Sequence, residues 1–133
     1  MIAAVAAAVV LAGSPCPPPV APLRSGPPLR AVALALDDGP GPLTQPFLDE
    51  LARLRTRATF FVVGRSAERR PALLLRMQGA GMELADHSWS HPLTAVRTEG
   101  QLRSEAQRTR DLLRAAGAAG CLFRPPYGDG PSA

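Results

Sequence analysis

The sequence of 133 residues contains no lysine, and all fifteen of its basic residues are arginines. Aromatic residues make up only 5% of it, and no basic run is interleaved with them. The arginines lie among acidic residues instead, as Arg53 does beside Asp49 and Glu50. Despite the net charge of +4, this pattern is typical of a solvated surface, so we expect no nucleic-acid partner. A weak attraction to an anionic cell wall stays open.

Cysteine is also scarce, with Cys16 and Cys121 alone. Neither belongs to a CxxC pair, which excludes a structural zinc knuckle of that spacing. The residues leave two alternatives: one disulfide if the protein is exported, or a Cys121 that acts as a small buried apolar residue on a strand. We favour the second interpretation.

No hydrophobic run is long enough to span a bilayer, so we expect no stable membrane span. Residues 1–13 are apolar and resemble the central region of a secretory signal, although they lack its charged start. The alternative is an unstructured alanine-rich start. Residues 14–28 contain seven prolines and form an extended linker, so the domain itself covers 29–133. We expect a secreted or cell-envelope protein.

From Arg30 onward, apolar runs alternate with helical patterns. The run 31–36 is continuously apolar, as in a strand buried on both faces. Further strands are expected at 58–63, 82–86 and 121–123. Thr44 is expected to cap a helix whose apolar positions Phe47, Leu48, Leu51 and Leu54 have helical spacing. Further helices are expected over 71–78 and after a capping box of Thr98 and Gln101. This α/β alternation predicts a parallel sheet, either doubly wound or about half of a (β/α) barrel.

Polar side chains follow the predicted strands. Asp37 and Asp38 come after the first strand, His87 and His91 after the third, and Arg124 after the fourth. Because the carboxyl ends of parallel strands share one edge, where ligands bind in such folds, we expect these five side chains to converge.

The chemistry of this set favours a metal ion. His87 and His91 are four residues apart, which lets both imidazoles reach one cation, and Asp38 would complete a set of two histidines and one carboxylate. The alternative is a pair of ordinary surface or capping histidines. Adjacent carboxylates also repel each other unless cations compensate, as a metal on Asp38 and Arg124 on Asp37 would.

Three motifs carry a resemblance to a known family. They are Leu36-Asp37-Asp38-Gly39-Pro40, His87-Ser88-Trp89-Ser90-His91-Pro92 and Arg124-Pro125-Pro126-Tyr127, with a similar second strand over Ala58–Gly64. In this order they resemble the polysaccharide deacetylase family, also called the NodB-homology domain or carbohydrate esterase family four. The resemblance covers roughly Arg30 to Gly128. It implies the N-terminal portion of a distorted (β/α) barrel whose C-terminal strands are missing.

The resemblance also implies an activity and its residues. The activity is metal-dependent removal of N-acetyl groups, or O-acetyl groups, from a carbohydrate polymer such as peptidoglycan or a chitin-like glycan. Asp37 would be the general base, Arg124 would orient it, and the backbone N–H of Tyr127 would bind the oxyanion. The metal, zinc before cobalt or another divalent ion, would be held by Asp38, His87 and His91.

One departure from the family concerns the proton donor. The family takes a further Asp, a Trp and a Leu-x-His histidine from beyond its third motif, whereas this sequence stops at Ala133 and has only two histidines. We therefore predict a truncated product and do not expect substantial deacetylase activity from it alone. The alternative is a non-catalytic remnant that binds metal or glycan. A haloacid-dehalogenase-type phosphatase is disfavoured, because Gly39 stands where its second Asp belongs.

Overall fold

The computed structural model describes residues 16–18 and 30–129. The predicted signal-like segment 1–13 lies outside these residues, as does most of the predicted linker 14–28. No helix among the described residues is long and apolar enough to cross a membrane.

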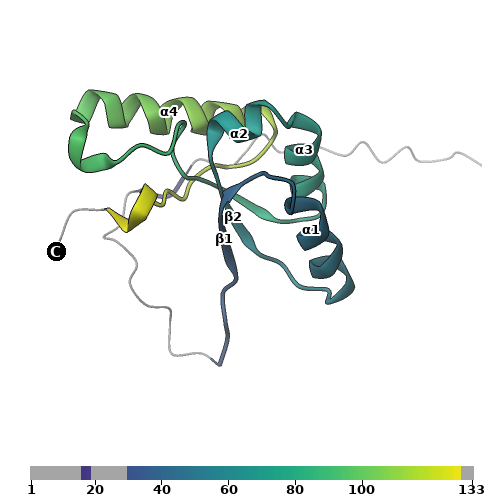
Figure 1. Ribbon diagram of the computed structural model, residues 1–133. Coiled ribbons are helices and arrows are strands. Elements are labelled where there is room, and N and C mark those ends of the chain that lie inside the picture. The colour runs from purple at the N-terminus through teal and green to yellow at the C-terminus, as the bar shows by residue number, and fades with distance from the viewer. Residues whose placement is uncertain (1–15, 19–29, 130–133) are drawn as a thin grey trace, which may run out of the picture.

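A parallel three-stranded sheet forms the centre of the fold (Figure 1). Its strands β1 (Ala35–Gly39), β2 (Thr59–Val62) and β3 (Glu83–Asp86) lie side by side in chain order. The predicted fourth strand, 121–123, is reduced to a single parallel bridge between Phe123 and Asp86. This bridge still places the fourth segment beside β3, so all four segments follow the chain order expected of a barrel.

Helices follow the strands as the crossovers of a parallel sheet require. The longer ones are α1 (Thr44–Arg53), α3 (Pro71–Gly79) and α4 (Glu99–Ala115), and short helical turns are α2 (Gly64–Glu68), η1 (Thr94–Val96) and η2 (Pro126–Gly128). The capping box is confirmed, because Thr98 and Gln101 each bond the other's backbone N–H. The sequence did not predict α2, a turn of only five residues.

Two details of α1 differ from expectation. Thr44 is the first helical residue and not the cap, and its hydroxyl accepts a hydrogen bond from the Gly41 N–H at 2.8 Å. Of its predicted apolar positions, Leu48 and Leu51 are buried, whereas Phe47 and Leu54 are about half exposed. The apolar stripe that the helix buries against the core is therefore narrower than the sequence predicted.

The hydrophobic core lies between the sheet and the helices. Alternate strand residues point into it, including Phe60 and Val62 of β2 and Leu84 of β3. They pack against buried helix residues: Leu48, Leu51, Ala67, Leu74, Met77 and Leu113. Figure 1 shows α1 and α3 together beside the strands, with α4 running across the carboxyl-end side.

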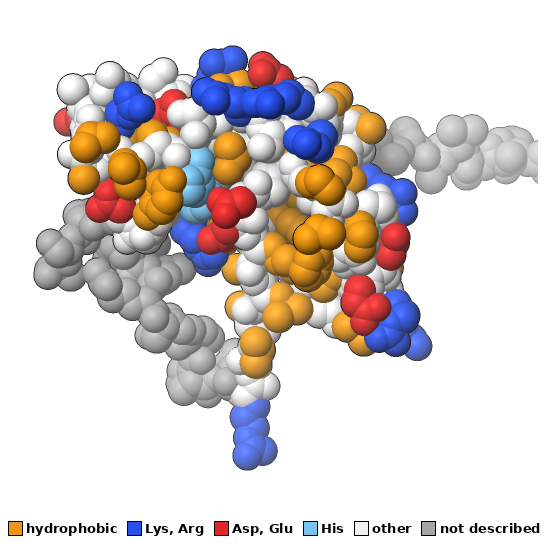
Figure 2. Space-filling model, in the orientation of Figure 1, with side chains coloured by type: hydrophobic (Ala, Val, Ile, Leu, Met, Phe, Trp, Pro, Cys, Tyr) orange, Lys and Arg blue, Asp and Glu red, His pale blue; other side chains and the backbone are white. Residues whose placement is uncertain are grey.

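The expected two-sided burial of 31–36 is wrong. The strand begins only at Ala35, and the side chains of Val32 and Leu34 are 87% and 44% exposed. Both residues lie before the start of β1, whose register with β2 begins at Ala35, and β1 is an edge strand among the described residues. Figure 2 shows hydrophobic side chains reaching the surface over this part of the molecule.

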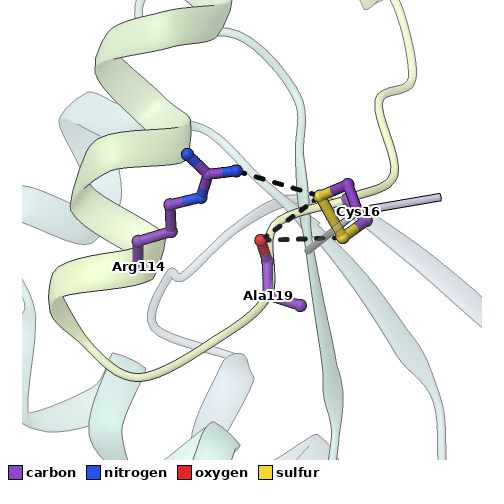
Figure 3. The surroundings of a disulfide bond; sticks show 4 residues. Cys16, Arg114 and Ala119 are labelled. Atoms are coloured by element: carbon purple, nitrogen blue, oxygen red, sulfur yellow. Dashed lines mark hydrogen bonds between the residues drawn. A yellow bond between two sulfur atoms is a disulfide. The ribbon is translucent and has the colours of Figure 1, made fainter. Parts of the chain in front are cut away.

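A disulfide joins Cys16 to Cys121 (Figure 3). The interpretation of Cys121 as a buried apolar residue is therefore wrong, and the disulfide alternative holds. The carbonyl oxygen of Ala119 lies 3.8 Å from both sulfurs, and an Arg114 guanidinium nitrogen lies 3.9 Å from Cys16 Sγ. The bond spans 105 residues and ties the N-terminal segment to the strand-like residues that lead to Arg124.

Candidate metal centre

The carboxyl ends of the strands carry unusual backbone conformations. Asp38, Ser88, His91 and Tyr127 have φ values of 67°, 66°, 57° and 60°, in the left-handed region that non-glycine residues rarely adopt. Such residues persist only where surrounding contacts over-determine them, and they cluster at functional sites. All four lie in or next to the three sequence motifs.

Asp38, His87 and His91 come together as predicted. Each offers one ligand atom, and these atoms all lie within 4.8 Å of one another. Asp38 Oδ1 is 3.1 Å from His91 Nε2 and 3.5 Å from His87 Nε2. Atoms bound tetrahedrally to zinc at about 2.0–2.1 Å are about 3.3 Å apart, so these spacings suit an ion of that size. Figure 2 shows histidine atoms reaching the surface beside acidic side chains, although His87 itself is buried.

The tautomer of His87 also fits a metal ligand. Its Nδ1 is 2.7 Å from the Arg124 carbonyl oxygen, which can only accept, so Nδ1 carries a proton. This leaves Nε2 directed at the Asp38 carboxylate, where a cation held between the nitrogen lone pair and the carboxylate oxygen would bind both. A backbone carbonyl on the outer nitrogen is one of the common ways in which proteins orient a ligand histidine. The residues present therefore fit a divalent metal.

Arg124 contacts both His87 of the ligand group and the neighbouring Asp37. While its carbonyl oxygen holds His87, its Nη1 donates to Asp37 Oδ1 at 2.6 Å. The guanidinium lies 3.9 Å above the Phe61 ring, on the sheet face opposite the core residue Phe60. Stacking on an aromatic ring and pairing with a carboxylate both suit the planar guanidinium, and together they fix Asp37 beside the ligand group.

Tyr127 and Asp129 close the site from the C-terminal side. The Tyr127 ring lies edge-on to His91, with centroids 4.6 Å apart. The Asp129 carboxylate accepts hydrogen bonds from the Thr94 hydroxyl and the Ala95 N–H, and these bonds, the first above all, lower the pKa of Asp129. They fasten the segment after Tyr127 to the chain that follows His91.

Asp86 is a buried acid directly before His87. It is fully buried, and this burial raises the pKa of its carboxyl to about 7, although the hydrogen bond from the Ser88 N–H and the charge of Arg110 oppose the shift. Its Oδ1 accepts that N–H at 2.7 Å, while Oδ2 has no partner.

Two contributors to the site, Asp129 and Glu105 of α4, were not among the residues predicted from the sequence. Glu105 accepts two hydrogen bonds from Ser90, next to His91. A signal was present: Glu105 lies between Leu102 and Thr109 at helical spacing, so it is an acidic residue on the inward stripe of its helix.

Known proteins resemble this chain in sequence. The sequence model of the polysaccharide deacetylase family matches residues 24–133. The chain is 39% identical over 101 residues to the peptidoglycan-N-acetylmuramic acid deacetylase PdaC of Bacillus subtilis, covering 74% of this chain and 22% of that protein. It is 41% identical to a chitooligosaccharide deacetylase of Sinorhizobium fredii, covering 79% of this chain and 50% of the relative.

A solved structure agrees with these sequence matches. The family 4 carbohydrate esterase from Streptomyces lividans, in complex with acetate, superposes with a TM-score of 0.72 at 40% identity, covering 75% of this chain and 53% of that one. The chain thus spans between about a fifth and about half of the length of these relatives. The likeness confirms the predicted fold class, the N-terminal portion of a NodB-like (β/α) barrel.

Proposed function

The chain belongs to the polysaccharide deacetylase family, and we propose that it binds a divalent metal ion and removes N-acetyl groups from a carbohydrate polymer. One observation carries the proposal: the ligand atoms of Asp38, His87 and His91 lie within 4.8 Å of one another, beside the Asp37–Arg124 ion pair. Deacetylation needs both elements, an electrophilic centre and a base next to it.

Asp38, His87 and His91 would hold the ion. Two imidazoles and one carboxylate suit zinc first, and cobalt or another divalent ion as well. When bound, such an ion lowers the pKa of a coordinated water and polarises the carbonyl of the acetamide.

The remaining roles belong to residues around the ligand group. Asp37 would accept the proton of the attacking water, since a carboxylate close to the reacting water can act as a general base. Arg124 engages Oδ1 of Asp37 at 2.6 Å and so sets the direction of that carboxylate. The Tyr127 backbone N–H would stabilise the oxyanion that forms on the acetyl carbonyl.

The substrate class and location follow from the relatives and from the disulfide. The relatives are named for peptidoglycan and chitooligosaccharides, so we propose peptidoglycan or a chitin-like glycan here, with N-acetyl or O-acetyl groups as targets. The Cys16–Cys121 disulfide supports a secreted or cell-envelope location, because disulfides persist in oxidising compartments.

A second candidate function is binding of metal or glycan without turnover. It is favoured by one observation: both histidines of the sequence belong to the proposed ligand set, which leaves no third histidine in this chain to protonate the departing amine.

Acetate release from a chito-oligomer of N-acetylglucosamine tests the proposal. The full chain, loaded with zinc, is compared with Asp37→Asn and with Asp49→Asn, an exposed aspartate of α1 that serves as the matched control. We expect Asp37→Asn to lower the rate by about 10²–10⁴-fold, the usual contribution of a general base, and the control to leave it unchanged. Metal binding without acetate release in the wild type would support the second candidate. A folded chain that binds no metal would contradict the proposal, and one that binds neither metal nor the oligomer would contradict both candidates.

A further inference from the structure

We infer that Glu105 of α4 is a positioning residue, which fixes His91 by holding the loop His87–His91 through Ser90. We call this loop the ligand loop. The inference rests on the proposed function, since it concerns the same metal site. Glu105 touches neither histidine, so it acts on the metal only through the backbone that carries His91.

The contact between Glu105 and Ser90 uses both carboxylate oxygens. The Ser90 N–H donates to Oε2 at 2.6 Å, and the Ser90 hydroxyl donates to Oε1 at 2.9 Å. Both residues are half-buried, where hydrogen bonds to a charged acceptor are stronger than in open water. Two bonds to one residue fix its direction as well as its place, and the next residue along the chain is His91.

The ligand loop needs such a support because its backbone is strained. Ser88 and His91 both have positive φ values, a conformation that relaxes unless outside contacts maintain it. The first half of the loop is held by the start of α2, where the N–H groups of Gly64 and Arg65 donate to the carbonyls of Ser88 and Trp89 at 3.0 and 2.9 Å. The second half is held at Ser90 by Glu105.

The helix that carries Glu105 is itself firmly placed. Its inner side buries Thr109 and Leu113 completely, and Arg108 stacks 3.5 Å above the Trp89 ring. At Gly64 the fit is so close that an added Cβ would come within 2.6 Å of Thr109 Oγ1 and 2.4 Å of Trp89. Because α2, α4 and the ligand loop are closely packed, α4 holds the carboxylate of Glu105 in place against Ser90.

Cobalt binding to the full chain measures the consequence, with Co²⁺ as the probe, followed by its visible absorption and by calorimetry. Glu105→Ala removes both hydrogen bonds, and we expect it to weaken Co²⁺ binding about tenfold, the lower range for residues that orient metal ligands. Glu105→Gln should rescue the affinity, because its amide oxygen can accept from the Ser90 N–H while its amide nitrogen donates to the Ser90 hydroxyl. Glu99→Ala, an exposed acid paired with Arg103 on the same helix, is the matched control and should bind like the wild type.

Amide hydrogen exchange in the presence of a chelator gives a second readout without metal. Faster exchange at Ser90 and His91 in Glu105→Ala, but not in Glu105→Gln or Glu99→Ala, supports the inference. Wild-type affinity and wild-type exchange in Glu105→Ala would overturn it, and so would a Glu105→Gln variant as impaired as Glu105→Ala. A wild-type chain that binds no Co²⁺ would instead overturn the proposed function, and the exchange of Ser90 would still decide the role of Glu105.

Discussion

The helix-covered face of the sheet and the carboxyl ends of its strands differ in side-chain polarity and in backbone conformation. The covered face is made of apolar side chains such as Phe60, Val62 and Leu84, which are at most 3% exposed and have ordinary strand or helix backbones. The strand ends hold Asp37, Asp38 and two histidines on backbone that is strained at several points.

This contrast indicates that the residues that stabilise the fold are largely different from those that form the proposed metal site. Burial of apolar surface stabilises the first region without requiring any one partner. The second region gathers carboxylates and imidazoles that only a cation would reconcile, so it contributes little to stability on its own. Changes in one region should therefore leave the other largely intact.

The largest effect is expected in the core. Leu84→Ala should lower the free energy of unfolding by about 2–5 kcal/mol, through lost burial and the cavity left behind. Leu75→Ala on α3, where the side chain is 54% exposed, is the control and should change stability by less than about 0.5 kcal/mol. Urea denaturation in chelator measures both, and a larger loss in Leu75→Ala would contradict the assigned core.

The next effect concerns the disulfide, which lies outside both regions. Replacing Cys16 and Cys121 by serine should lower the free energy of unfolding by about 2–4 kcal/mol, because the bond restricts the unfolded chain. Reduction of the wild type by dithiothreitol should produce the same loss. An unchanged denaturation midpoint after reduction would contradict a stabilising role of the bond.

The third effect belongs to the strand ends. Asp38→Asn keeps a residue that tolerates positive φ but removes the negative charge, so Co²⁺ affinity should fall by at least about 100-fold, or about 2.8 kcal/mol. The Asp38 side chain is 71% exposed, so unfolding in chelator should stay at the wild-type value. A calorimetric titration checks the affinity, and a variant that binds Co²⁺ normally would remove Asp38 from the ligand set.

The smallest effect lies at the border of the two regions, in Asp86. Burial raises the pKa of Asp86 from 3.8 to about 7, so the folded chain retains a proton that the unfolded chain releases. This contribution to stability is fully present below about pH 4 and is lost as the pH rises to about 7. The Tm measured in chelator should therefore fall by roughly 10 °C between pH 5 and pH 8, and Asp86→Asn should flatten the slope. Glu83→Gln, at the exposed start of β3, should keep it.

The sequence predicted the elements whose signals are local. The capping box of Thr98 and Gln101 marked the start of α4, and Asp38, His87 and His91 were placed together because parallel strands share their carboxyl ends. Their spacing alone could not reveal the positive φ of Asp38 or His91, since backbone conformation there depends on the surrounding contacts.

What the sequence could not predict depends on tertiary neighbours. The apolar run 31–36 looked buried on both faces, yet burial is decided by what lies across the sheet, and Val32 is 87% exposed. The pairing of Cys16 with Cys121 joins residues 105 apart and follows from no local pattern. The helical spacing marked Glu105 as inward-facing, but its contact with Ser90 became visible only when α4 and the ligand loop were brought together.

The most direct measurement is anomalous diffraction from crystals of the full chain grown with zinc, recorded at the zinc absorption edge. We predict one strong peak bonded to Asp38 Oδ1, His87 Nε2 and His91 Nε2, with Asp37 and Arg124 still paired beside it. A peak elsewhere, or no peak in a well-ordered crystal, would contradict the assignment of these residues as the metal centre.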